Sequence, residues 1–113
     1  MNLDHTKQLL AGKFDGLDAR SLFIEVLRSS IELLSIEDND FAWSSWANQA
    51  EAVAEVQSIL SAVEAGALPD RLKCSVLFAP TGPIQEVSLS SGWGEPFLTV
   101  AEKFDNVEKV LWS

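Results

Sequence analysis

The chain has 113 residues, 47% of them hydrophobic, and its 17 acidic against eight basic residues leave a formal net charge of -9 at pH 7. This length and composition predict one globular domain over residues 1–113. The charge argues against nucleic acid and anionic membrane surfaces as partners. Because the chain has neither an apolar run of about 18 residues nor the start of a secretory signal, we expect a cytoplasmic protein without a membrane partner.

The first part of the chain predicts helices. In residues 1–17, glycines at positions 12 and 16 interrupt regular structure, so this segment is expected to be a short first helix or a flexible arm. The next stretch, LDARSLFIEVLRSSIELLSIE, repeats apolar residues at intervals of three and four behind Asp18, a good N-cap residue. That spacing predicts an amphipathic helix.

A second long helix is predicted for residues 40–65. Asp40 is its candidate N-cap, and Trp43 and Trp46 begin its apolar stripe one turn apart. Gly66 and a proline three residues later should end it. Because the linker IEDND between the two helices is short, we expect them to fold back as an antiparallel hairpin with both tryptophans in the core.

Residues 70–78, DRLKCSVLF, fit either a strand or a short helix, because their apolar positions match both periods. The following IQEVSLSS predicts a strand, with Val87 and Leu89 on one face and serines on the other. GEPFLTVAEKF then predicts a helix with Pro96 in its first turn. The expected fold is α+β and helix-dominated: an antiparallel helical hairpin packed with a short strand or hairpin and a C-terminal helix.

The order of WSSWANQAE, a helix ending at Gly66, RLKCSVLF and APTGPIQEVSLS resembles a family of small, uncharacterised bacterial domains over residues 41–90. In that family a tryptophan-bearing helix precedes a short helix, a glycine-containing turn and one hydrophobic strand. Members usually have a glycine pair where this chain has Ala79 and Pro80. The resemblance implies a helix for residues 70–78 and implies neither an activity nor a functional residue.

Acidic residues dominate the middle of the chain. Between Arg28 and Arg71 there is no Lys or Arg, but there are eight acids. Such a block is either a solvated, solubilising surface or a face that steers a basic protein partner. Under the second interpretation, the candidate partner-binding residues are Glu37, Asp38, Asp40, Glu51, Glu55 and Trp93.

Residues 77–96, LFAPTGPIQEVSLSSGWGEP, hold three of the six glycines. They lack the lysine of a phosphate loop and the third glycine of a dinucleotide fingerprint. Instead, two prolines should stiffen a turn around Gly82, which is expected to adopt a positive φ, while Gly92 and Gly94 lead from the strand to the last helix. Trp93, between those glycines, is either a lid over the core or an exposed anchor for a partner.

The residues available for chemistry are few. One histidine, His5, one cysteine, Cys74, and no tyrosine argue against a nucleophile-histidine site and a closed zinc site. Cys74 lies in an apolar run and is expected to be a small buried hydrophobe. The acidic linker lacks the glycine and the later glutamate of a calcium loop. We therefore predict no catalytic residue, no metal and no cofactor, although a carboxylate pair acting as acid and base stays open.

Two functions follow from these patterns. The first is a small, acidic, non-enzymatic protein-binding domain, of the immunity or inhibitor kind, that meets a basic protein. The alternative is a small-ligand-binding or weakly catalytic domain that uses the loop of residues 81–93 and nearby carboxylates. A deep pocket would favour the alternative, whereas a flat or convex acidic surface would favour the first.

Overall fold

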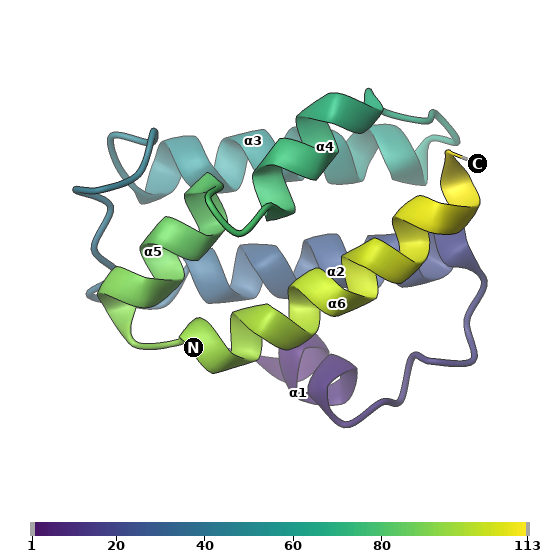
Figure 1. Ribbon diagram of the computed structural model, residues 1–113, viewed down its shortest axis with the longest axis horizontal. Helices are drawn as coiled ribbons and strands as arrows, with labels where there is room; N and C mark the ends of the chain where they lie inside the picture. The colour runs from purple at the N-terminus through teal and green to yellow at the C-terminus, as the bar shows by residue number, and fades with distance from the viewer. Residues whose placement is uncertain (1, 113) are drawn as a thin grey trace.

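The computed structural model describes residues 2–112, and all of the regular structure in that range is helical (Figure 1). The helices are α1 (Asp4–Leu10), α2 (Ala19–Leu34), α3 (Gln49–Glu64), α4 (Arg71–Phe78), α5 (Pro83–Ser91) and α6 (Gly94–Leu111). No strand occurs among the described residues. The predicted α+β fold is therefore wrong, and the protein is an all-helical bundle.

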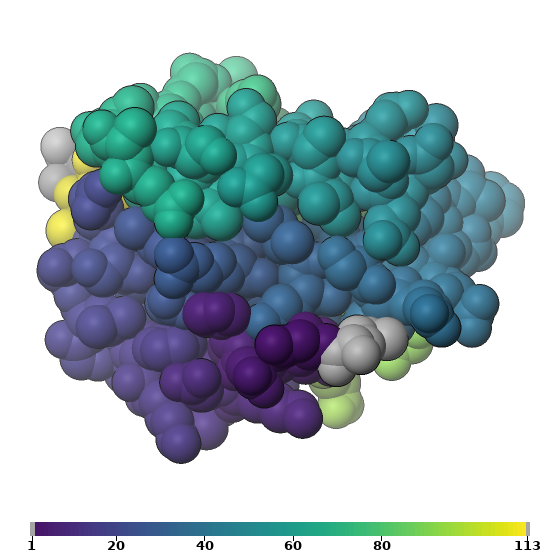
Figure 2. Space-filling view, turned by 180° about the vertical axis from the view of Figure 1, so that it is seen from behind, coloured from purple at the N-terminus to yellow at the C-terminus, as the bar shows by residue number. Residues whose placement is uncertain are grey.

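Helix α2 is the centre of the bundle, packed by α1, α3, α5 and α6. Helices α2 and α3 run antiparallel, as the hairpin prediction required, and α6 crosses α2 on the side that faces the viewer in Figure 1. Helices α4 and α5 pack against α6 on that same side. From behind, the visible face is formed mainly by α1, α2 and α3 (Figure 2).

One continuous core joins these helices. Phe23 of α2, Phe78 of α4 and Phe104 of α6 meet in it, with ring centroids 5.9 Å apart for Phe23 and Phe104 and 4.5 Å for the stacked pair Phe78 and Phe104. Trp112 places its ring edge against Phe23 at 5.8 Å. Because these aromatic residues come from both ends of the chain, their burial ties α6 back to the central helix.

Side-chain caps explain where helices α2 and α4 begin. The Oδ1 of Asp18 accepts a hydrogen bond from the backbone N–H of Ser21 at 2.8 Å, which confirms the predicted cap of α2. Asp70 caps α4 by accepting from the N–H of Lys73 at 2.9 Å. Residues 70–78, for which either a strand or a short helix was predicted, therefore form a helix. The first segment likewise forms a short helix, α1, rather than a flexible arm.

Helix α3 begins later than its pattern predicted. Its N-cap is Asn48, whose Oδ1 accepts from the N–H of Glu51 at 3.0 Å, and not Asp40. Asp40 instead accepts from the N–H of Ala42 at 2.9 Å and so makes a local turn. Residues 35–48, hereafter the α2–α3 connection, therefore replace both the short linker and the first two turns of the expected helix.

The segment predicted as a strand forms α5. Its buried residues, Ile84, Val87 and Ser88, follow the spacing of a helix, and the hydroxyl of Ser88 donates to the carbonyl of Gln85 at 2.7 Å. A lone strand would leave its backbone N–H and C=O groups without partners, whereas a helix pairs them internally. The left-handed Gly92, with φ 87°, ends the helix as a C-cap.

Gly82 is needed for a reason other than the predicted positive φ. Its φ is -83°, so that prediction is wrong. A Cβ atom at this position would collide with the carbonyl oxygen of Val76, and it would lie 3.1 Å from the carbonyl oxygens of Leu77 and Ala79. Gly82 thus allows the end of α4 and the start of α5 to approach each other closely.

Candidate functional site

Three hydrogen bonds that involve side chains hold the α2–α3 connection in place. The Nδ2 of Asn39 donates to the carbonyl of Leu33 at 2.9 Å, and its Oδ1 accepts from the indole Nε1 of Trp93, also at 2.9 Å. The backbone N–H of Asp40 donates to the hydroxyl of Ser91 at 2.8 Å. The connection is therefore fastened to the end of α2 and to the turn between α5 and α6.

Trp93 is buried, with 6% of its surface exposed. Its indole covers the core while its N–H reaches Asn39. This position corresponds to the lid interpretation of the glycine-flanked tryptophan. Trp93 is not an exposed anchor, and a partner could not contact it without displacing the α2–α3 connection.

Trp43 and Trp46 take opposite environments, although both were expected in the core. Trp46 is 5% exposed and packs into the core, whereas Trp43 is 74% exposed. The turn between them separates the two rings: the hydroxyl of Ser44 donates to the carbonyl of Phe41 at 3.0 Å and accepts from the N–H of Trp46 at 3.2 Å. The core prediction for Trp43 is wrong because these residues form a turn rather than one face of a helix.

Three of the eight acids in the block were not predicted to bind a partner, and each of them makes a contact inside the protein. Glu32 accepts hydrogen bonds from the backbone N–H groups of His5 and Thr6 at 3.0 and 2.7 Å, and so caps α1 from α2. Glu64 pairs with Arg28 at 2.9 Å, and Asp70 caps α4. Because their charges are partly neutralised or used locally, these three acids contribute little to a partner-binding face.

The five remaining acids are the carboxylates predicted to bind a partner. Glu37 and Asp38 are exposed in the α2–α3 connection, and Asp40 is half-buried there. Glu51 is exposed and Glu55 is half-buried in the first two turns of α3. The segments that carry these residues and Trp43, the α2–α3 connection and the start of α3, lie at the left of Figure 1. We call this surface the acidic end: Glu37, Asp38, Asp40, Trp43, Glu51 and Glu55.

One residue of the acidic end, Asp38, has an unusual backbone conformation. Asp38 has φ 68°, in the left-handed region, where aspartate and asparagine are tolerated better than other residues with a Cβ. This conformation turns the chain just before Asn39 makes its contacts with Leu33 and Trp93. The acidic end is therefore carried by an ordered turn and not by a free loop.

A hollow of about 460 Å³ extends from the acidic end onto α4. Ser45 and Glu55 line one side, and the exposed apolar side chains of Leu72 and Val76 line the other. Lys73 is the only basic residue of the lining. Exposed apolar side chains beside an open hollow are typical of a protein-binding surface rather than of a deep ligand pocket.

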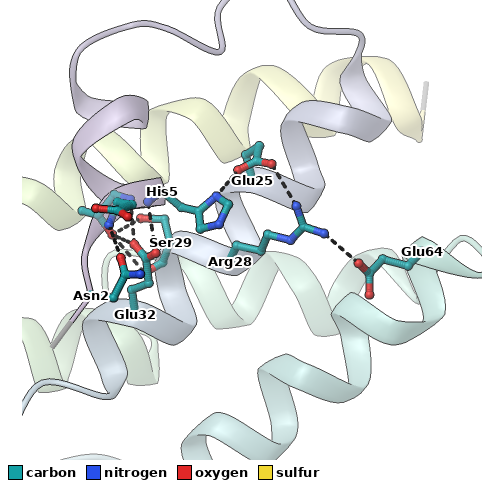
Figure 3. A network of polar contacts seen from close by, with 9 residues as sticks. Asn2, His5, Glu25, Arg28, Ser29, Glu32 and Glu64 are labelled. Atoms are coloured by element: carbon teal, nitrogen blue, oxygen red, sulfur yellow. Dashed lines mark hydrogen bonds and ion pairs between the residues drawn. The ribbon is translucent and has the colours of Figure 1, made fainter.

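A polar network joins α1, α2 and α3, and it includes residues that the sequence analysis did not connect (Figure 3). The Nδ1 of His5 lies 2.6 Å from Oε2 of Glu25, and the guanidinium of Arg28 lies 3.2 Å from Glu25 and 2.9 Å from Glu64. The hydroxyl of Thr6 lies 2.8 Å from that of Ser29 in the buried part of the network. The network docks α1 and α3 onto α2. Sequence spacing indicates its i,i+3 pair, Glu25 and Arg28, but not its contacts between helices.

Two titratable groups, the thiol of Cys74 and the carboxyl of Glu108, have shifted pKa values. Burial raises the pKa of the Cys74 thiol to about 11, so the thiol is protonated and not a nucleophile at neutral pH. The pKa of Glu108 is lowered, first by the hydroxyl of Ser75, which donates to its carboxylate, and then by Arg71 at 3.3 Å. Among residues 2–112 no cluster of three or more His, Cys, Asp or Glu side chains is placed to hold a metal ion.

Comparisons of the chain with models of known protein families, with curated proteins and with solved structures give no match. The resemblance of residues 41–90 to a family of small bacterial domains therefore stays a hypothesis. In the part of the chain that the structure describes, no helix is both long enough and apolar enough to span a membrane.

Proposed function

We propose that this chain is a small, non-enzymatic protein-binding domain, of the immunity or inhibitor kind, whose acidic end captures a basic protein. The observation that carries this function is that Trp43, 74% exposed, lies in the same connection as Glu37, Asp38 and Asp40. Within residues 2–112 no ion pair neutralises these three carboxylates or those of Glu51 and Glu55. Tryptophan is enriched among the residues that dominate binding energy at interfaces. Surrounding carboxylates add attraction to a basic partner and raise its association rate.

The small-ligand alternative receives no such support. It required a loop at residues 81–93, but most of that segment is helix α5 and its tryptophan is buried. Cys74 has a raised pKa and is fully buried, so it offers no nucleophile. Residues of this segment do line a hollow beside Glu95, but it is an open surface hollow and not a deep pocket, so this alternative has the weaker support.

We also propose a cytoplasmic location and a partner that is not nucleic acid. A net charge of -9 repels the phosphate backbone, and the acidic end concentrates that charge where the exposed tryptophan lies. We propose a bacterial origin on the resemblance of residues 41–90 alone.

Capture experiments with matched variants test this function. Wild type, Trp43→Ser and the triple variant Glu37→Gln, Asp38→Asn, Asp40→Asn are immobilised and exposed to lysate at low and moderate salt. The matched control is Asp4→Asn, Glu86→Gln, Glu102→Gln, which removes the same charge outside the acidic end. We expect both acidic-end variants to lose a basic partner that wild type and the control retain, and the loss by the triple variant to be largest at low salt. Equal capture by all four proteins would make the acidic end merely solubilising.

A further inference from the structure

A second surface lies on α4, α5 and α6, which face the viewer in Figure 1. One hollow of about 340 Å³ lies between these helices, and the side chains of Phe78, Phe97 and Phe104 line it. Another of about 480 Å³ lies over the junction of α5 and α6. Gln85 and Leu98 line both, so the two hollows form one groove with Leu98 as a ridge between them. We call it the α5–α6 groove.

The groove leaves large apolar side chains in water. Leu89 is 67% exposed and Leu98 is 60% exposed, and both line the hollow at the α5–α6 junction. Gly92 and Gly94 line the same hollow and have no side chains, so these two positions do not cover the leucines. Apolar surface of this kind, next to a concave floor, marks an interaction site more often than a scattered surface residue does.

The charged residues of the groove have one sign. Glu95 lines the hollow at the α5–α6 junction, and Asp105 and Glu108 line the other. Glu108 is paired with Arg71, but within residues 2–112 no ion pair holds Glu95 or Asp105. The apolar floor is therefore bordered by carboxylates that a basic partner would complement.

The dimensions of the groove suit a helix. It follows α6 from Glu95 to Glu108, a rise of about 20 Å at 1.5 Å per residue. A partner helix of about 14 residues has the same length and presents apolar side chains at i, i+3 or i+4, and i+7 on one face. Leu98, between the two hollows, would fit between successive turns of such a stripe.

We infer that the α5–α6 groove binds an amphipathic helix with a leucine-type stripe and lysine or arginine residues along its edges. A second copy of this chain is a poorer occupant, because it would bring Glu95 and Asp105 against the acidic surface of a chain with net charge -9. The inference rests on α4–α6 residues and shares none with the acidic end, so either surface can bind a partner without the other.

Designed peptides test the groove directly. The probe is a fluorescent, helix-forming peptide of about 14 residues with a leucine stripe flanked by lysines. Its two controls are the same peptide with glutamates in place of the lysines, and one of the same composition with the stripe scrambled. Affinity is measured by fluorescence anisotropy, and the site is mapped by amide chemical shifts of the isotope-labelled protein.

We expect only the lysine-flanked striped peptide to bind, with shifts concentrated in α5 and α6. Leu98→Gln should weaken binding about tenfold, because one leucine contact is lost. Leu68→Gln, an equally polar change at an exposed leucine between α3 and α4, should not. Trp43→Ser should leave this affinity unchanged even if it abolishes the function proposed above, so the two proposals fail separately.

Several results would overturn the inference. These are no binding up to the solubility limit of the peptide, equal binding of the three peptides, shifts mapped to the acidic end, or an affinity that Leu98→Gln does not change. Sedimentation of the protein alone gives one more: a dimer that Leu98→Gln dissociates would show that a second copy occupies the groove.

Discussion

The indole N–H of Trp93 donates to the side-chain oxygen of Asn39 at 2.9 Å, across 54 residues of sequence. Through this contact a buried tryptophan in the α5–α6 turn holds the α2–α3 connection against the bundle. The same asparagine donates to the carbonyl of Leu33 at 2.9 Å, which also closes the end of α2. Asn39 is thus the residue that sets where the acidic end lies.

Asn39→Ala should destabilise the fold by about 1–3 kcal/mol, because a buried indole N–H loses its acceptor. Asn39→Asp keeps an acceptor for Trp93 but puts a carboxylate oxygen against the carbonyl of Leu33 in place of a donor, so it should destabilise the fold as well. Urea unfolding measures both, with Asn106→Ala at an exposed helical position as the control. Equal stability of Asn39→Ala and wild type would show that the contact does not contribute.

The two tryptophans of the connection should respond oppositely to truncation. Trp46→Ala should cost about 3–5 kcal/mol, because it opens a cavity in the core. Trp43→Ala should change stability by no more than about 0.5 kcal/mol, since its ring is mostly in water. Thermal unfolding of both variants compares them, and a large loss for Trp43→Ala would place its ring in the core after all.

Substitution of two glycines by alanine, one in a crowded and one in an open position, tests how closely α4 and α5 approach each other. Gly82→Ala should destabilise by about 1–3 kcal/mol or more, because its Cβ would meet the backbone carbonyl of Val76, which cannot move without shifting α4. Gly16→Ala has nothing within 4 Å of its Cβ and needs no positive φ, so it should be neutral or stabilise slightly. The urea midpoints of the two variants are compared with that of wild type. A Gly82→Ala variant as stable as wild type would contradict the close approach of α4 and α5.

Glu32 should matter locally for α1. Glu32→Ala removes the acceptor of the His5 and Thr6 N–H groups and of the Thr6 hydroxyl, so amides of α1 should exchange with solvent much faster. Amides in the middle of α2 and α6 should keep their protection. Glu37→Ala, another glutamate but exposed in the connection, is the control that should change neither. Unaltered exchange in α1 would mean that other contacts hold that helix.

Alkaline pH should weaken the fold partly through Cys74. Burial raises the pKa of its thiol from 9.0 to about 11, so the folded state binds a proton that the unfolded state has lost between those values. The stability from this group is therefore fully present below about pH 9 and is lost as pH rises through about 11. Urea unfolding from pH 8 to 10 should show a steeper decline for wild type than for Cys74→Ala, and parallel declines would contradict this.

Local signals predicted those parts of the fold that depend on neighbours in sequence. Asp18 caps α2 as its position suggested, and the apolar spacing behind it gives the central helix. The helix containing Pro96 and the antiparallel order of α2 and α3 also follow from spacing. The contacts that form α2 and α6 lie within one or two helical turns, so the sequence alone contains them. The antiparallel order was predicted correctly, but from a short linker that the structure replaces with the longer connection of residues 35–48.

Elsewhere the same local signals fit two structures. Val87 and Leu89 alternate as in a strand, yet Ile84, Val87 and Ser88 also match a helix, and eight residues are too few to separate the periods. Asp40 and Asn48 are both good N-caps, and Asn48 became the cap of α3 while Ser91, 51 residues away, bound the N–H of Asp40. Tertiary contacts made the choice because each alternative is nearly equal in local energy.

The candidate site divides in the same way. The sequence by itself determined the net charge, the acidic block and the poor supply of catalytic residues. Only the tertiary structure decided that Glu32 and Glu64 are bound internally, that Trp93 is buried and that Trp43 is exposed. The exposure of a side chain depends on which parts of the chain, distant in sequence, pack together. Local spacing of residues does not predict how α1, α3 and the α5–α6 turn pack around α2.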